Sequence, residues 1–262
     1  CRLSLIVHLQ ILISVHGDMG VSEEHGYTPY QMFWNFNLNL TEIKMRYVYD
    51  KLDKSFANLV RDKTVAVVGP APYTANVNLV DEIESRDLVV RINRGFPVIE
   101  EMKSHVGSRT DIHYTVGPWV ARNFVDYIAD LEKKPLKFIT LTYPRKLKPN
   151  EHLFKKKLDS MCIGYKKVSN LDFANFIGVL KARPSTGNMA ILDLLAYPIK
   201  ELYICGITFY MDGFYYEKYG NPRTGKTLKR HQPDIQRVPM LQAFQDPRVA
   251  IEPTMRKIIL GE

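Results

Sequence analysis

Short apolar runs alternate with helical patterns from about residue 63 to the end of the chain. Runs of four or five residues rich in Val, Ile, Leu and Tyr are typical of buried strands, and apolar residues spaced three or four apart indicate helices between them. This alternation predicts an α/β fold with a mostly parallel central sheet and helices on both faces. The expected strands are 64–68, 88–92, 111–115, 137–141, 165–168, 201–205 and 248–251, and the expected helices are 119–131, 151–161, 185–196 and 234–244.

The first 60 residues follow a different pattern. Apolar residues at every second position from 3 to 13 suit a half-buried strand, with a truncated membrane anchor as the alternative. His8 and Gln10 interrupt this run, which is shorter than the roughly 20 apolar residues of a spanning helix, so no membrane anchor is evident. Residues 41–59 predict an amphipathic helix. We therefore expect an N-terminal extension over residues 1–60 and a single domain over 61–262.

The composition is that of an ordinary globular protein, with 45% hydrophobic and 24% charged residues among 262. Lys and Arg outnumber Asp and Glu by 36 to 28, which gives a formal charge of +8. An anionic partner would explain this excess, and so would surface solubility. Most of it lies in mid-chain lysine clusters, which are typical of solvated surface. Because the basic residues do not interleave with aromatic ones as in RNA-binding modules, nucleic acid is disfavoured as a partner.

Three loops are candidates for ligand binding, because ligands of such sheets gather where loops lead from strands into helices. The first, Gly69-Pro-Ala-Pro72, lacks the glycine spacing of a dinucleotide-binding motif. Asn93 ends a predicted strand and could bind a ribose or phosphate, although a turn-forming Asn is the commoner explanation. Ser185, Thr186 and Gly187 open a predicted helix, where exposed N–H groups favour an anion; an ordinary capped helix is the alternative.

Four ordered segments resemble the motifs of a known family, the animal-type sialyltransferases. The ordered set, over about residues 63–250, is more specific than any single motif. The segments are residues 64–69 with 83–93 (large sialylmotif), 184–192 with 201–209 (small sialylmotif), Tyr215-Tyr-Glu217 (third motif), and His231 followed by Gln236 (very small motif, His-x4-Glu). The chain thus resembles a divergent member of glycosyltransferase family 29.

This resemblance implies an inverting, metal-independent transfer of sialic acid from CMP-sialic acid to a glycan hydroxyl. It also implies a Rossmann-like, GT-A-variant fold in the domain 61–262, with no cofactor beyond the CMP-sugar donor. His231 would be the general base, and Gln236 would position it. The residues that the resemblance assigns to the donor site are Gly69, Asn93, Ser185, Thr186, Gly187, Tyr215 and Tyr216.

The sequence departs from the family pattern at several places. Pro70 stands where the family has an Asn that offers an amide, Phe214 replaces a His, and Gln236 replaces an acid. The cysteine pair that the resemblance would place between the large and small motifs is absent. Cys205 lies in a predicted buried strand and is expected to pack there without a disulfide.

These departures leave two alternatives open. One is transfer of another CMP-activated sugar acid, such as Kdo. The other is a catalytically inactive relative that acts as a structural or binding component of a larger assembly. The resemblance implies the Golgi lumen if the chain is a cropped catalytic domain, and the cytoplasm if it is a microbial or viral-type enzyme.

Overall fold

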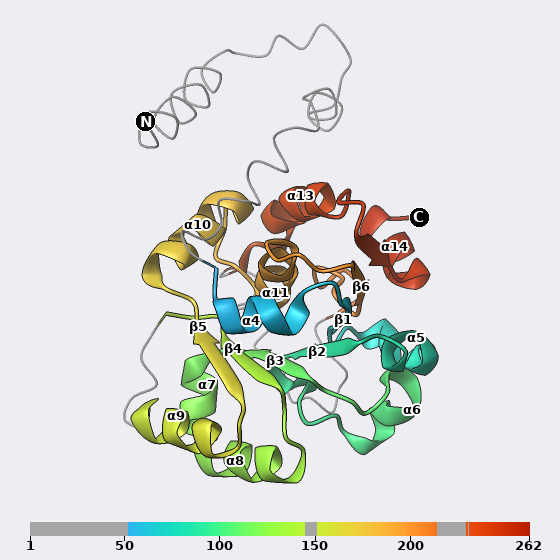
Figure 1. Ribbon diagram of the computed structural model, residues 1–262. Coiled ribbons are helices and arrows are strands. Elements are labelled where there is room, and N and C mark those ends of the chain that lie inside the picture. The colour runs from blue at the N-terminus through green and yellow to red at the C-terminus, as the bar shows by residue number, and fades with distance from the viewer. Residues whose placement is uncertain (1–51, 145–150, 214–228, 230) are drawn as a thin grey trace, which may run out of the picture. The chain divides into compact units, whose positions relative to one another are not determined.

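The computed structural model describes residues 52–144, 151–213, 229 and 231–262 (Figure 1). These residues belong to one compact unit, Thr41–Glu262. The predicted strand at 3–13, most of the predicted helix at 41–59, and Phe214, Tyr215 and Tyr216 lie outside the described residues. Among the described residues, no helix is long and apolar enough to cross a membrane.

A seven-stranded sheet forms the centre of the described part of the chain. The strands lie in the order β5-β4-β3-β2-β1-β6-β7, and every neighbouring pair is parallel. The prediction of a mostly parallel sheet is therefore confirmed. The strands are β1 (Thr64–Val68), β2 (Leu88–Ile92), β3 (Ile112–Thr115), β4 (Phe138–Leu141), β5 (Gly164–Lys167), β6 (Glu201–Cys205) and β7 (Val249–Ile251).

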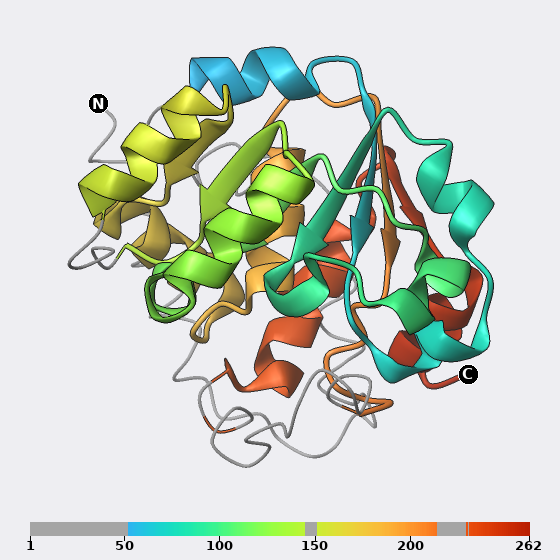
Figure 2. The same ribbon diagram turned by 90° about the horizontal axis from the view of Figure 1, so that it is seen from below.

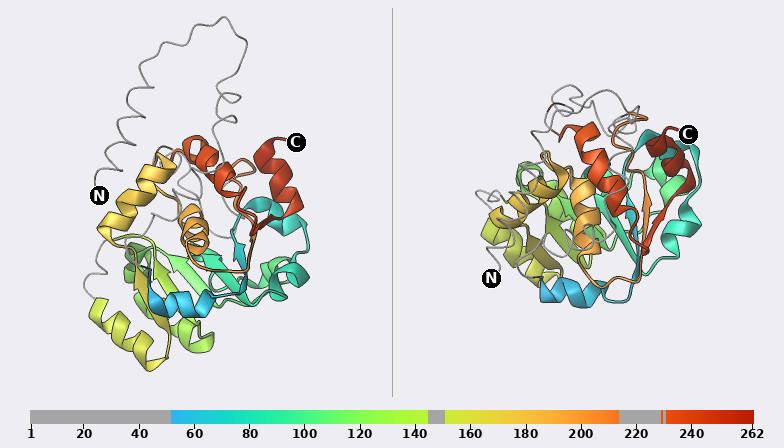
Figure 3. Two further views of the ribbon diagram at one scale, coloured as in Figure 1. Left: turned by 45° about the horizontal axis from the view of Figure 1, so that its top comes forward. Right: turned by 90° about the horizontal axis from the view of Figure 1, so that it is seen from above.

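Helices cover both faces of this sheet, as the alternating pattern predicts (Figures 1 and 3). One layer contains α4 (Lys54–Val60), α10 (Asn170–Leu180), α11 (Thr186–Leu195), α13 (Pro233–Ala243) and α14 (Pro253–Leu260). The other contains α5 (Val80–Glu84), α6 (Lys103–Val106), α7 (Gly117–Arg122), α8 (Phe124–Lys133) and α9 (Glu151–Ser160).

Successive residues of a central strand pack against different layers. In β1, Val65 and Val67 join the core beneath α11, whereas Ala66 and Val68 join the core beneath α5 and α6. Because both faces are covered, this strand is apolar at every position after Thr64 instead of alternating.

Two helical predictions need correction. The single helix expected over 119–131 is two helices, α7 and α8, because Asn123 between them leaves the helical conformation (φ −114°, ψ 29°). The helices α5, α6, α10 and α14 are not among the predicted ones. Start signals for α10 and α14 are nevertheless present, because the Ser169 hydroxyl and the Glu252 carboxylate accept hydrogen bonds from N–H groups of the first turn.

The boundary predicted at residue 60 remains a prediction. The described part of the segment 1–60 includes α4, whose Phe56 and Val60 are fully buried in the same core as β1 and α11. Thus α4 packs with the predicted domain.

Candidate functional site

Loops far apart in the sequence meet at the carboxyl ends of β1, β2 and β6. The strand order reverses here, since the chain adds β2 to β5 on one side of β1 and then places β6 on the other. Such a switch point leaves a crevice that commonly binds a ligand. A pocket occupies this crevice, at the carboxyl ends of the strands, which are the ends to which the arrows point in Figure 2. Its polar lining residues are Asn93, Ser185, Thr186, Asn188, Thr208, Tyr210 and Gln236, and Pro70 and Gly187 also contribute.

The amino end of α11 forms one wall of this pocket. Ser185 caps the helix as predicted, because its hydroxyl oxygen accepts a hydrogen bond of 3.2 Å from the N–H of Asn188. Thr186 and Gly187 carry the first N–H groups of the helix, which have no acceptor within it. Both residues line the pocket. The positive end of the helix dipole therefore favours an anionic group there.

Close packing requires glycine at Gly69 and leaves little room for a side chain at Gly187. A Cβ atom on Gly69 would lie 2.1 Å from the carbonyl oxygen of Gly206, so the turns after β1 and β6 can approach only as glycines. A Cβ atom on Gly187 would lie 3.1 Å from Cδ1 of Ile207 and 3.2 Å from Cδ1 of Ile92. Gly187 lines the pocket, whereas Gly69 does not. The reason for Gly69 is thus the approach of two chain segments, and its donor-binding role stays a prediction.

Two asparagines bring unpartnered oxygens to the pocket. Asn93 directly follows β2 and has a left-handed conformation, with φ 48°. Its Oδ1 atom is buried and has no hydrogen-bond partner among the described residues, and the same is true of Oδ1 of Asn188. Leaving a buried acceptor unsatisfied costs free energy unless a ligand supplies a donor. The pocket is therefore suited to a ligand that carries N–H or O–H groups.

A buried histidine holds the main chain of Asn93. Nε2 of His113 donates to the carbonyl oxygen of Asn93 at 2.7 Å, so Nδ1 accepts from the hydroxyl of Tyr127 at 2.6 Å. Complete burial lowers the pKa of His113 to about 4, and the hydrogen bond to Asn93 opposes this shift in part. No sequence signal marks the contact, because it arises only where β2 and β3 lie side by side.

His231 and Gln236 meet at one carbonyl group. Nδ1 of His231 lies 3.1 Å from the carbonyl oxygen of Arg183, and Nε2 of Gln236 lies 2.9 Å from it. Because a carbonyl oxygen can only accept, Nδ1 of His231 carries the proton and Nε2 has the basic lone pair. This tautomer leaves Nε2 able to accept a proton from a substrate.

Gln236 joins three segments of the chain. Its side chain is buried, and Oε1 accepts hydrogen bonds from the N–H of Ser185 at 3.1 Å and from Nδ2 of Asn188 at 2.9 Å. Nε2 donates to the carbonyls of Arg183 and His231. Gln236 therefore contacts the main chain of His231. A carboxylate here would face two carbonyl oxygens, so an amide suits this position better than the acid of the family motif.

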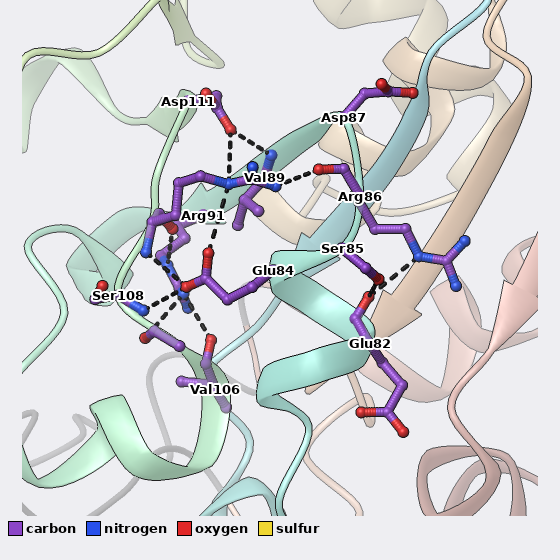
Figure 4. A network of polar contacts seen from close by, with 12 residues as sticks. Glu82, Glu84, Ser85, Arg86, Asp87, Val89, Arg91, Val106, Ser108 and Asp111 are labelled. Atoms are coloured by element: carbon purple, nitrogen blue, oxygen red, sulfur yellow. Dashed lines mark hydrogen bonds and ion pairs between the residues drawn. The ribbon is translucent and has the colours of Figure 1, made fainter.

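A separate polar network shapes the loop after α6 (Figure 4). The guanidinium of Arg91, which is buried, donates to the carbonyls of Val106 and Gly107 at 2.7 and 3.1 Å. The Glu84 carboxylate accepts from the N–H of Ser108 at 2.7 Å. Arg91 and Glu84 belong to the segment that resembles the large sialylmotif, so part of that motif fixes a loop beside β2 and does not line the pocket.

Both cysteines in the described part of the chain, Cys162 and Cys205, are free thiols. Where the resemblance would place a disulfide, main-chain hydrogen bonds join the segments, from Asp62 to Pro198 at 2.8 Å and from Lys200 to Lys63 at 2.9 Å. Cys205 is a free thiol, fully buried in β6, as predicted, and burial raises its pKa to about 12. No group of three or more His, Cys, Asp or Glu side chains in this part of the chain could hold a metal ion.

A wider groove adjoins the pocket. Asn93, Ser185, Thr186 and Tyr210 line both cavities, whereas His231 lines the groove and not the pocket. The sequence reasoning missed most of the groove, whose residues come from separate elements. These further lining residues are Arg94, Val116, Pro118, Trp119, Arg122, Thr142, Tyr143, Phe173, Arg183, Pro184 and Met189.

A parallel α/β sandwich with its pocket at the switch point is the arrangement of nucleotide-binding α/β proteins. Within that class, the family model for glycosyltransferase family 29 (sialyltransferase) matches residues 18–159, which is more than half of the chain. The chain therefore belongs to glycosyltransferase family 29 and is a sialyltransferase-like glycosyltransferase. The match covers the large motif and ends before Ser185 and His231, whose assignment still depends on the motif resemblance.

Two solved sialyltransferase structures are similar to this chain at low sequence identity. A mammalian sialyltransferase is 16% identical, with a TM-score of 0.50 over 90% of this chain and 87% of its own. The sialyltransferase CstII from Campylobacter jejuni, in complex with CMP-3FNeuAc, is 15% identical, with a TM-score of 0.48 over 76% of this chain and 83% of its own. No curated protein matches the sequence. At 16% identity the likeness to the mammalian enzyme concerns the fold alone. The parallel sheet with helices on both faces confirms the predicted α/β sandwich.

Proposed function

We propose that this enzyme transfers sialic acid from CMP-sialic acid to a glycan hydroxyl, with inversion at the anomeric carbon and without a metal ion. The observation that carries the proposal is the junction of two cavities. A pocket suited to a nucleotide shares a wall with a larger groove, and His231 lines the groove side of that wall. The family supplies the class of reaction, and the arrangement of residues supplies the roles.

Neutral groups would bind the donor. The phosphate of CMP fits the amino end of α11, beside the N–H groups of Thr186 and Gly187. The amino group of cytosine and the hydroxyls of ribose are donors, which match the unpartnered Oδ1 atoms of Asn93 and Asn188. None of the described residues that line this pocket carries a charge. The N–H groups of the helix and the side-chain amides would therefore bind the donor.

His231 would act as the general base. As the acceptor oxygen forms its bond to the anomeric carbon, the bond from that carbon to the phosphate oxygen breaks. The acceptor proton moves to Nε2 of His231, and CMP leaves as an anion that the α11 N–H groups stabilise. The base lines the groove and the phosphate site lies in the pocket. Such a separation suits attack from the face opposite the leaving group.

The test is transfer with purified protein, CMP-sialic acid and a panel of glycan acceptors, followed by CMP release and by mass spectrometry of the glycan. The substitution His231→Ala should reduce kcat by roughly 10²–10⁴-fold, the usual effect of removing a general base, while CMP still binds. His152→Ala, which removes an exposed histidine of α9, is the matched control and should change little. Full activity of the His231→Ala enzyme would disprove the role of this base.

Pro70 favours a second candidate donor. It lines the pocket and has no N–H group, where the family motif has an Asn. Another CMP-activated sugar acid, such as Kdo, is therefore tested beside CMP-sialic acid, with and without EDTA. Release of CMP from CMP-Kdo alone would replace the first donor, and loss of activity in EDTA would contradict the metal-free mechanism. No release from any donor would favour a non-catalytic binding role.

A further inference from the structure

The groove carries a concentration of positive charge that donor binding does not require. Arg94, Arg122 and Arg183 all line it, together with His231. Not one of its described lining residues is acidic. The adjoining pocket, which is the proposed site of the anionic nucleotide, has no charged lining residue in the described chain. The cationic side chains are thus concentrated on the side where the acceptor would bind.

Two of these arginines have no carboxylate partner among the described residues. Arg122 is exposed at the end of α7 and forms no ion pair there. Arg183 is half-buried, and its guanidinium carbon lies 4.6 Å from the centre of the Tyr143 ring instead of beside an acid. By contrast, Lys157 and Lys167, elsewhere in the chain, pair with Glu132 and Glu151 respectively. The groove therefore retains unneutralised guanidinium groups, which suit carboxylate or sulfate oxygens because they present a planar pair of donors.

Aromatic side chains stand beside these arginines. Trp119 lies one helical turn before Arg122 on α7. Tyr143 packs edge-on against Phe173, with ring centres 5.1 Å apart, and also lies under Arg183. Flat, largely apolar surfaces next to fixed charge-assisted donors are suited to a sugar ring that bears an anionic substituent. Neutral glycans would use the aromatic surfaces but leave the arginines unpaired.

We propose that the acceptor is an acidic glycan, whose carboxylate or sulfate group is bound by Arg122 and Arg183 in this groove. The inference rests on the proposed transferase function and specifies its acceptor class. Because Arg122 lines the groove and not the pocket, its contribution should fall on the acceptor and not on the donor.

The experiment compares initial rates with lactose and with lactose derivatives that carry a sialic acid carboxylate or a sulfate. The wild-type enzyme should use at least one acidic acceptor with a kcat/KM about tenfold or more above that for lactose, the scale of a hydrogen bond to a charged group. Arg122→Gln should lower kcat/KM for that acceptor by about tenfold, with the KM for the donor unchanged. High salt should lower the kcat/KM for the acidic acceptor more than the kcat/KM for lactose. The two acidic derivatives distinguish a carboxylate from a sulfate as the group bound.

The matched control is Arg61→Gln, which removes an exposed arginine that follows α4 and precedes the amino end of β1, whereas the groove lies at the carboxyl ends of the strands. It should leave the acidic preference intact. Equal use of neutral and acidic acceptors by the wild-type enzyme would overturn the inference while the transferase function stands. So would a rise in donor KM caused by Arg122→Gln with every acceptor. If no acceptor reacts, the proposed function fails, and binding of the same glycans in the presence of CMP, measured by NMR, then tests the inference. The inference is rejected if the wild-type protein does not bind the acidic glycans more tightly than lactose. It is also rejected if Arg122→Gln leaves that preference unchanged.

Discussion

At the scale of single residues, the position of Asn93 depends on a histidine that is not in the pocket. The left-handed conformation of Asn93 is uncommon for a residue with a side chain, so neighbouring groups must stabilise it. The Nε2 proton of His113 binds the Asn93 carbonyl, and the hydroxyl of Tyr127 fixes the ring from its other nitrogen. Only the neutral imidazole can make both bonds as described. Protonation of His113 would therefore disturb the end of β2.

The low pKa of His113 predicts how stability changes with pH. Between pH 6.5 and about 4 the unfolded chain binds a proton at this site and the folded protein does not. The free energy of unfolding should therefore fall as pH is lowered through this window, by roughly 3 kcal/mol in total from His113. Urea unfolding at pH 7 and pH 5 measures the change. His113→Gln should reduce the slope, whereas His105→Gln, which removes a half-buried histidine bonded to Val77, should keep it. The same slope in His113→Gln would contradict this assignment.

At the scale of elements, α11 connects the core to the site. All ten of its residues are buried, which agrees with a helix that is apolar on nearly every side. Its amino end lines the pocket, where Ser185 caps it and Gln236 binds the first turn. The helix and its cap could be predicted from the sequence, because capping is a local signal. The contact between Asn188 of this helix and Gln236 could not be predicted, because these two residues are 48 positions apart in the chain.

Removal of the cap should affect both stability and donor binding. Ser185→Ala should lower the free energy of unfolding by about 1 kcal/mol, the usual effect of losing an N-cap side chain. It should also raise the KM for the donor, because the cap orders the N–H groups that face the pocket. The matched control is Ser169→Ala, which removes the equivalent cap of α10 outside both cavities. Ser169→Ala should lower the free energy of unfolding by a similar amount and leave the donor KM unchanged. If both variants change the donor KM equally, the amino end of α11 has no special role in donor binding.

At the scale of the whole molecule, the mid-chain lysines are more engaged than their sequence clusters indicate. Lys137, Lys155, Lys157 and Lys167 form ion pairs with neighbouring acids, three of them near the surface with both partners partly exposed. Lys166 differs, because its ammonium group lies 2.7 Å from Asp193 inside the protein, and burial lowers its pKa. Because their acids balance them, these paired lysines do not account for the excess charge of +8.

The buried ion pair should be far more important for stability than an exposed one. Lys166→Met would leave the Asp193 carboxylate, which is 2% exposed, without its cation, and should cost about 3–5 kcal/mol in the free energy of unfolding. Lys155→Met removes one partner of an exposed pair on α9 and should cost less than about 1 kcal/mol. Chemical denaturation of both variants gives the comparison. A loss for Lys166→Met as small as for Lys155→Met would mean that Asp193 is solvated or protonated in the variant.

The sequence alone determined where the strands lie along the chain, the mostly parallel sheet with helices on both faces, the cap of α11 and the family resemblance, because these depend on patterns within short segments. The order of the strands in the sheet came from the structure. It also predicted the loop residues Asn93 and Ser185, which the structure brings to one pocket. The tertiary structure decided which groups meet: His113 with Asn93, Gln236 with Arg183, and the arginines of the groove. These contacts join residues that are 20 or more positions apart in the chain, so they exist only when the parallel sheet brings the strand ends together.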